Sequence, residues 1–179
     1  MIQSKDDFYN YILADRIANK IDLSFHMKFL ITWRYLICLR KVEYVNNCKH
    51  GFGANLLKMY LKIKLYRLSV KSGLTIPINT FGKGLYIPHH GAIVVNSSAK
   101  FGDDCVIQNG VNISSDVVGG NHVYLGAGSK VMIGVKIAND VIIGANSVVT
   151  HDVSEDNVVV AGAPAKIVSY HGFNGRKKI

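Results

Sequence analysis

The chain has 179 residues, of which 49% are hydrophobic and 18% are charged. This composition excludes a disordered protein and is sufficient for one globular core. Its three cysteines include no C-x-x-C pair, which excludes a disulfide framework and a cysteine-based zinc site. A reducing compartment suits such cysteines, so we expect a cytoplasmic protein. The first residues contain acids where a secretory leader has a cationic end and an apolar run, so no leader is expected.

The net charge of +9 is concentrated in the first part of the chain. Residues 1–72 contain 13 Lys and Arg against 5 Asp and Glu, a balance of +8, which leaves +1 for the remainder. Such a segment could attract an anionic membrane or a lipid-linked glycan, and a peripheral membrane contact is one expectation. No nucleic-acid motif or aromatic-basic platform accompanies the charge, so we expect no nucleic-acid partner.

Residues 1–72 predict a small α-helical N-terminal region. Ser4 followed by two aspartates predicts a helix start, and apolar residues at helical spacing continue to Ala18. Two more helices are expected, over Phe25 to Leu39 and over Leu56 to Val70, with a Gly-Phe-Gly break between them. The basic residues of these helices are expected on a solvated face.

After Gly73 the periodicity changes to six residues. An apolar residue recurs at every sixth position from Val95 to Val149, with Gly119 as the exception. Four residues after each of them stands a small or β-branched residue. Ten repeats in register indicate stacked units that share one continuous core. A β-sandwich would place its turns at 8–12 residue spacing, and a parallel α/β fold needs helix-length segments between strands.

Several of these steps resemble those of a known family. The steps L-G-A-G-S-K (125–130) and I-G-A-N-S-V (143–148) are similar to those of the hexapeptide-repeat acyltransferases. The closing G-A-P-A-K (162–166) resembles the turn that ends their β-helix and holds coenzyme A. The resemblance implies a mainly β fold, a left-handed parallel β-helix of triangular coils over residues 73–168, and a basic tail at 169–179. It also implies a homotrimer with sites shared between neighbouring subunits.

The first steps of the repeat resemble two particular groups within this family. F-G-K-G-L-Y (81–86) and I-P-H-H-G-A (87–92), followed by Ile93-Val94 as a two-residue insertion, are similar to the serine acetyltransferases and the capsule or polysaccharide O-acetyltransferases. In that layout the third residue of the second step is a histidine. The resemblance therefore assigns His89 as the general base that lets a hydroxyl attack acetyl-CoA directly.

The other expected site residues follow from the same layout. Small residues of the later coils let the pantetheine arm of CoA approach the backbone, and Lys166 is expected at a CoA phosphate. The candidates to orient His89 are a backbone carbonyl or an acid of this or a neighbouring subunit, such as Asp103, Asp104 or Asp116. Asp103 and Asp104 are rather expected in solvated turns. The expected contacts are Gly126, Ala127, Gly144, Ala145, Pro164 and Lys166 for CoA, and His90, Asn109 and Asp116 for the acceptor, which is a small molecule or a glycan.

Three departures from the serine enzymes bear on the acceptor. Pro88 stands where they have an aspartate before the histidine, and residues 74–79 lack a second aspartate found one coil upstream in those enzymes. Residues 114–120 replace a longer loop that ends in an arginine-histidine pair. Because these groups would contact the charged ends of serine, we expect a sugar hydroxyl in capsule, polysaccharide or lipopolysaccharide synthesis. Serine O-acetylation in cysteine biosynthesis is the alternative.

Two other functions are weighed against acetyl transfer. The β-helix carbonic anhydrases hold zinc through histidines that include an H-x4-H pair, and this spacing is absent, so no metal site is expected. A β-helix trimer without activity stays open as a scaffold. Met132 and Cys105, which occupy repeat positions, are expected in the core rather than in the chemistry.

Overall fold

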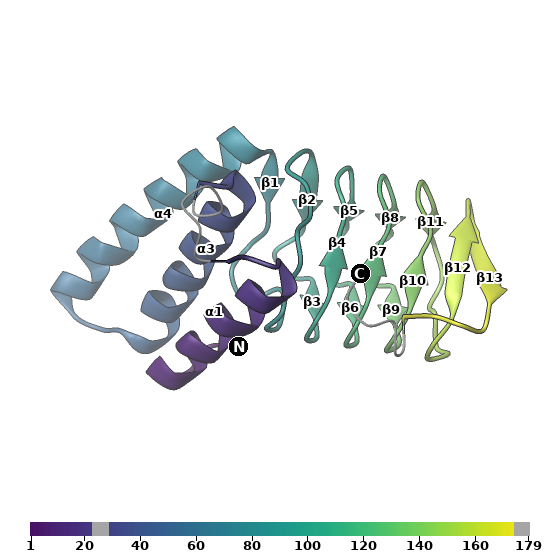
Figure 1. The fold of residues 1–179 in the computed structure, drawn as a ribbon, viewed down its shortest axis with the longest axis horizontal. Coiled ribbons are helices and arrows are strands. Elements are labelled where there is room, and N and C mark those ends of the chain that lie inside the picture. Colours follow the sequence, from purple (N-terminus) through teal and green to yellow (C-terminus); the bar gives the residue numbers. More distant parts are fainter. Residues whose placement is uncertain (23–28, 174–179) are drawn as a thin grey trace.

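The computed structural model describes residues 1–22 and 29–173, and it consists of a helical region followed by a β-solenoid (Figure 1). The three described helices are α1 (Lys5–Ala18), α3 (Ile31–Cys48) and α4 (Phe52–Ser72). The predicted start of the first helix is confirmed, because the Ser4 Oγ accepts a hydrogen bond from the Asp7 N–H at 3.0 Å. None of the helices in the described ranges is both long and apolar enough to cross a bilayer.

The bounds of the other two helices differ from the prediction. α3 begins at Ile31, and residues 25–28 of the predicted helix lie outside the described residues. Phe52 and the glycine after it belong to the first turn of α4, because Gly51, at φ 94°, is already the N-cap. At the other end, Gly73 adopts a left-handed conformation with φ 71°, which stops α4 and turns the chain into the solenoid.

The solenoid is a triangular prism, and each of its three faces is a β-sheet of parallel strands, apart from one antiparallel strand at the end. Face A contains β1 (Leu74–Thr75), β2 (Ile93–Val95), β5 (Asn112–Ile113), β8 (Lys130–Val131) and β11 (Val148–Val149). Face B contains β3 (Lys100–Phe101), β6 (Val118–Gly119) and β9 (Lys136–Ile137). Face C contains β4 (Val106–Ile107), β7 (Tyr124–Leu125), β10 (Ile142–Ile143), β12 (Val159–Gly162) and the antiparallel β13 (Ala165–Ser169).

Three six-residue steps make one coil, so Val94, Asn112, Lys130 and Val148 lie side by side on face A. The predicted left-handed parallel β-helix, of about five turns, is confirmed. Both inward series of the six-residue repeat are buried, from Val95 to Val149 and from Ala99 to Val153. Cys105 is buried as expected, whereas Met132 lies on a turn with 42% of its surface exposed, which corrects its expected place in the core.

We name the three edges of the prism by the faces that they join. The C–A edge contains the turns that leave face C and enter face A, and in Figure 1 the strands β4, β7 and β10 point towards it. The A–B edge leads from face A to face B, and the B–C edge leads from face B to face C. Every predicted site residue in a turn can therefore be assigned to one of three lines along the molecule.

Candidate active site

The C–A edge gathers most of the predicted site residues into one row. From the helical end, it consists of the turns at residues 88–92, 108–111, 126–129 and 144–147 and the hairpin turn after Gly162. Backbone hydrogen bonds connect successive turns, such as Gly128 N–H to the Asn109 carbonyl at 2.9 Å and Asn146 N–H to the Ala127 carbonyl at 2.8 Å. The repeat stacks these turns because equivalent residues of neighbouring coils are 18 positions apart.

His89 and His90 are exposed in the first turn of this row, which is longer than the others. Tyr86 pairs with Val106, and Val94 pairs with Asn112. Val94 is eight positions after Tyr86, whereas Asn112 is only six positions after Val106. The two extra residues therefore lie in the turn that contains the histidines. The predicted insertion is real, but Ile93 and Val94 are not its location, because both belong to β2.

Helical residues fix both ends of this longer turn. The Ile87 N–H donates to Asn19 Oδ1 at 3.1 Å, and the Gly91 N–H donates to the Ser72 carbonyl at 2.8 Å. Asn19 also donates to the Leu85 carbonyl at 2.8 Å. The turn is therefore held by the ends of α1 and α4, while the side chain of His89 makes no hydrogen bond to any described residue of the chain.

Asn109 is exposed one coil further along the same edge. Its Cβ lies 3.3 Å from the position that a Cβ on Gly91 would occupy, so this glycine allows the two turns to approach. The structure thus brings Asn109 beside the histidine turn, as the acceptor assignment requires.

Gly126, Ala127, Gly144 and Ala145 occupy the next two turns. A Cβ on Gly126 would lie 2.5 Å from the Ile143 carbonyl oxygen, so the spacing of the coils by itself requires glycine there. Among the described residues, no partner accepts the backbone N–H groups of Asn109, Ala127 and Ala145. Each of these three turns therefore offers at least one backbone N–H without a partner among the described residues.

The closing hairpin contains the two remaining cofactor candidates. Pro164 follows a cis peptide bond in the turn after Gly162, whose N–H donates to Ser147 Oγ at 3.2 Å, so this turn continues the C–A edge. Lys166 instead lines a groove of about 400 Å³ at the end of the solenoid, which Asp152 and Glu155 also line. Lys166 thus lines the groove at the end of the solenoid, two residues after Pro164.

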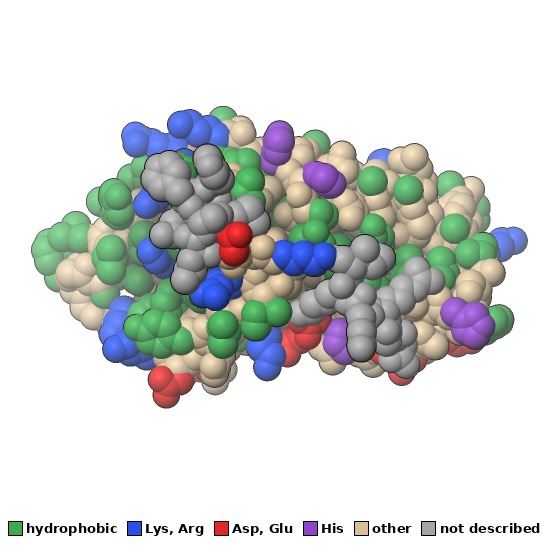
Figure 2. Space-filling model, in the orientation of Figure 1, with side chains coloured by type: hydrophobic (Ala, Val, Ile, Leu, Met, Phe, Trp, Pro, Cys, Tyr) green, Lys and Arg blue, Asp and Glu red, His purple; other side chains and the backbone are tan. Residues whose placement is uncertain are grey.

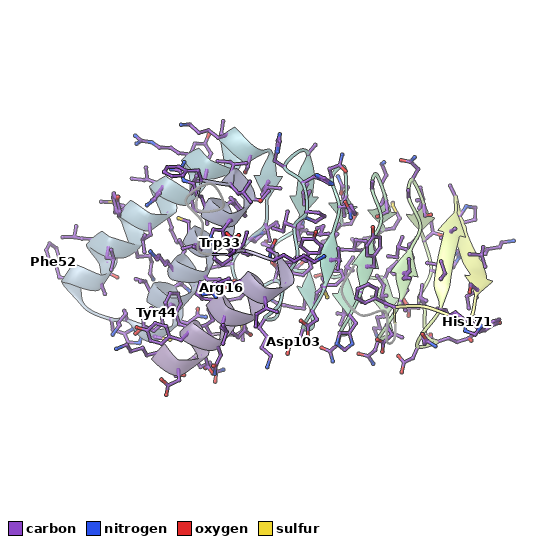
Figure 3. The ribbon with its side chains drawn as sticks, in the orientation of Figure 1. Arg16, Trp33, Tyr44, Phe52, Asp103 and His171 are labelled. Atoms are coloured by element: carbon purple, nitrogen blue, oxygen red, sulfur yellow. The ribbon has the colours of Figure 1, made fainter. Side chains whose placement is uncertain are left out.

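The acids expected to orient His89 lie on other edges of the same chain. Asp103 and Asp104 are on the B–C edge, and Figure 3 shows Asp103 at the margin opposite the C–A edge. Asp103 contacts Lys83, with the carboxylate 3.7 Å from Nζ. Asp116 is exposed on the A–B edge, where its N–H donates to Ser98 Oγ at 2.8 Å. Within one chain, none of the three acids is placed on the edge of His89.

The sequence-based prediction overlooked a histidine that does have carboxylate partners. His122 lies on the B–C edge, with Nδ1 3.1 Å from Asp140 and Nε2 3.7 Å from Asp104. The three residues are 18 positions apart, and this spacing is the signal that could have found the column. Among the described residues, no group of three or more His, Cys, Asp and Glu side chains is arranged to hold a metal ion.

The sequence-based prediction also missed a buried ion cluster between the helices and the first coil. Arg40 of α3 is fully buried, and its guanidinium contacts Asp15 of α1 at 2.8 Å and Glu43 at 2.9 Å. The same guanidinium donates to the Phe81 carbonyl at 3.0 Å, while Asp15 accepts from the Leu85 N–H at 2.9 Å. Burial lowers the pKa of Arg40, but the two carboxylates outweigh it and hold that pKa above its ordinary value. The sequence signal for this cluster is Asp15, an acidic residue at a position where the helical spacing predicts an apolar one.

Comparison with known proteins establishes the fold. No protein-family model matches the chain, and no curated protein sequence matches it. A serine acetyltransferase from Brucella abortus strain S19 superposes with a TM-score of 0.73 at 22% identity, over 94% of this chain and 72% of that one. The same enzyme in complex with coenzyme A gives 0.75 at 23% identity, over 95% and 71%. The soybean serine acetyltransferase apoenzyme gives 0.75 at 20% identity, over 92% and 70%.

Proposed function

We propose that this protein is an acetyl-CoA-dependent O-acetyltransferase. The observation that carries the proposal is the C–A edge, where an exposed His89 stands at one end of a row of small turns with free backbone donors. The solved structures with this fold support the proposal, because they include serine acetyltransferases and a complex with coenzyme A.

The proposed reaction needs one base and one polarised thioester. A ring nitrogen of His89 takes the proton from the acceptor hydroxyl, and the oxygen attacks the carbonyl carbon of acetyl-CoA. The carbon–sulfur bond breaks, and the imidazolium returns its proton to the departing sulfur. The products are the acetyl ester and free coenzyme A. Backbone N–H groups on the edge can stabilise the negative oxygen that forms in this step.

The later turns of the same edge suit the CoA arm. The N–H groups of Ala127 and Ala145 can donate to the amide carbonyls of pantetheine, and the absence of large side chains leaves them accessible. Gly126 and Gly144, which allow the coils to stack closely, and Pro164 of the closing turn are proposed to lie against the same arm. Lys166 is proposed to meet a CoA phosphate at the end of the solenoid.

A homotrimer completes the proposed site. A heterologous interface can set the A–B edge of one subunit against the C–A edge of the next, which brings Asp116 opposite His89 and His90. Exposed apolar residues support an interface at this edge: Met132 is 42% exposed and Ile133 is 66% exposed on an A–B turn. In this arrangement a neighbouring subunit supplies the acid that the chain itself does not place beside His89.

The comparisons favour L-serine as the acceptor, because the solved structures with this fold include a serine acetyltransferase from Neisseria gonorrhoeae in complex with serine. They thus support the alternative from the sequence better than its first expectation. A sugar hydroxyl is the second candidate, and Pro88 is the observation in its favour. No side-chain carboxylate precedes the histidine to bind the charged end of an amino acid.

Thiol release from acetyl-CoA tests the function. The protein is incubated with acetyl-CoA and either L-serine, other amino acids, nucleotide sugars or oligosaccharides. We expect CoA release with L-serine, and release with a sugar alone would move the assignment to the second candidate. If calorimetry detects no acetyl-CoA binding and no acceptor gives release, the chain is a scaffold and the proposal is wrong.

His89 is tested with the acceptor that is found. His89→Gln should lower kcat about 100-fold or more, because a general base contributes about that much. The matched control is His122→Gln, which removes an exposed solenoid histidine on another edge and should retain turnover. Loss of turnover in the control, with activity retained in His89→Gln, would assign the base to the B–C edge instead.

The remaining expectations belong to the same proposal. Residues 1–72 are the helical region, 73–168 the acyltransferase domain and 169–179 a basic tail, of which residues 174–179 lie outside the described residues. We propose the cytoplasm as the site of the reaction, and cell fractionation tests this location.

A further inference from the structure

α4 carries an apolar stripe on the side that faces away from the other described residues. Its inner side packs against α3 and buries Leu61, Leu68 and Ser72. Six large apolar residues on the outer side are between 48% and 81% exposed, and they are spaced four, three, four, three and four positions apart: Phe52, Leu56, Met59, Ile63, Tyr66 and Val70. At 3.6 residues per turn this spacing forms one continuous line along the helix.

Basic residues flank the stripe on both sides. By helical position, Lys62 lies on one side, and Arg67 and Lys71 lie on the other. α4 contains five basic residues and no acidic residue over its whole length. Figure 2 shows hydrophobic side chains at the helical end of the molecule with Lys and Arg side chains beside them. The surface therefore combines exposed apolar area with uniformly positive charge.

These charges distinguish between two possible occupants of the stripe. A second copy of α4 would bury the apolar residues, but it would place basic residues against basic residues without any acid to pair with them. An anionic bilayer offers hydrocarbon to the stripe and phosphate or carboxylate groups to its flanks. Lys and Arg side chains reach the headgroups while their aliphatic parts remain in contact with the apolar boundary.

We propose that α4 docks on an anionic lipid bilayer, with its axis parallel to the membrane plane and the apolar stripe in the headgroup–acyl boundary. α4 is the outermost of the described helices, and Phe52 lies at the end of the molecule farthest from the solenoid (Figures 1 and 3). No described residue covers the long outer side, which can meet a flat surface. This surface is separate from the C–A edge, and the proposed membrane docking does not depend on the proposed acetyl transfer.

Co-sedimentation of the full chain with lipid vesicles tests the proposal. The probes are vesicles of phosphatidylcholine alone and vesicles with about 30% phosphatidylserine. We expect binding to the anionic vesicles, weaker binding to the neutral ones, and a decrease in binding at high salt because the flanking charges are screened. Absence of binding to anionic vesicles by the folded protein would overturn the proposal.

Two triple variants separate the contributions of charge and apolar area. Lys62→Gln with Arg67→Gln and Lys71→Gln should lower the partition coefficient roughly 100-fold, because each basic residue near an anionic surface contributes about one factor of five. Met59→Gln with Ile63→Gln and Tyr66→Gln should lower it at least as much. The matched controls are Lys130→Gln with Lys136→Gln, and Val168→Gln with Tyr170→Gln, which change exposed residues of the solenoid and should retain binding.

A tryptophan probe distinguishes insertion from a purely electrostatic contact. Tyr66→Trp should give a blue shift of fluorescence with anionic vesicles, whereas Tyr170→Trp, which replaces an equally exposed tyrosine, should not. If the apolar triple variant binds vesicles like the unmodified protein but has a smaller mass in light scattering, a second copy covers the stripe. That result would reject the bilayer as its occupant.

Discussion

Gly119 explains the one gap in the inward apolar series. It stands on face B beside Phe101, whose ring occupies the space that a side chain at position 119 would need. Phe101 also stacks on Phe81, with ring centroids 4.9 Å apart. Two aromatic rings in successive coils thus fill the prism interior, and the third coil compensates with glycine.

Gly119→Ala tests this compensation. The added methyl group would overlap the Phe101 ring, so we expect a loss of about 1–3 kcal/mol in the free energy of unfolding, measured by denaturant titration. The second substitution Phe101→Leu should restore part of the loss, because it removes the clashing ring edge. Gly53→Ala in α4 is the control, since nothing lies within 4 Å of the added methyl group. A loss in the control as large as that of Gly119→Ala would contradict the explanation.

Tyr35 gives the protein a defined response to alkaline pH. Its hydroxyl donates to the Ile76 carbonyl at 3.0 Å and accepts from the Ile76 N–H at 2.9 Å. Burial raises the pKa of Tyr35 to about 12, although the bond to Ile76 opposes this shift. The folded state therefore holds the phenol proton more tightly than the unfolded state, whose tyrosine titrates near 10.

The resulting stability is complete below pH 10 and is lost as the pH rises towards 12. The loss amounts to about 3 kcal/mol in the free energy of unfolding.

Tyr35→Phe should destabilise the protein by about 1–3 kcal/mol at pH 7, because the Ile76 N–H loses its partner. The variant should also lose less stability than the unmodified protein between pH 10 and 12. The free energy of unfolding is measured by urea titration at several pH values. An equal decrease from pH 10 to 12 in both proteins would contradict the assignment. Tyr66→Phe, on an exposed site, is the control.

At the scale of elements, the Arg40 cluster joins the helices to the first coil. Arg40→Met leaves the Asp15 and Glu43 carboxylates buried without their cation, so we expect a loss of about 3–5 kcal/mol in the free energy of unfolding. Lys41→Met is the matched control, because Lys41 is the next residue of α3 and is exposed. Thermal unfolding of the two variants gives the comparison, and similar midpoints would contradict a structural role for the cluster.

The same cluster bears on the candidate site through the coil that it holds. Phe81 and Leu85, which contact Arg40 and Asp15, belong to the coil that ends in the histidine turn. Asn19 adds a contact at Ile87, two positions before His89. The helical region thus fixes the first coil from one side, and the stacked coils fix it from the other.

At the scale of the whole molecule, the proposed site requires three chains. Light scattering should give three times the mass of one chain, because Asp116 and His89 occupy different edges and can meet only across an interface. Met132→Glu with Ile133→Glu should lower that mass by placing charge on the exposed apolar turn of the A–B edge. Val168→Glu with Tyr170→Glu, which places the same charges on exposed apolar residues outside that edge, is the control. A monomer that retains full turnover would contradict the shared site.

The solenoid, the helix start at Ser4 and the place of each turn along the repeat can be predicted from the amino-acid sequence alone. Each six-residue step has its own inward residue and turn, so the pattern is local and repeats until it is unmistakable. The place of His89 beside a two-residue break in the repeat also follows from the number of residues between steps. Only the location of the extra residues, within the turn and not at Ile93-Val94, required the strand register.

Tertiary structure alone decided which distant residues meet. Asp15, Arg40 and the Phe81 carbonyl come together because three elements dock, and no periodicity in the chain encodes that docking. The contacts of Asn19 and Ser72 with the histidine turn depend in the same way on how α1 and α4 dock against the first coil. A repeat specifies how each coil stacks on the next through short-range geometry, whereas contacts between edges and helices depend on the shape of the finished fold.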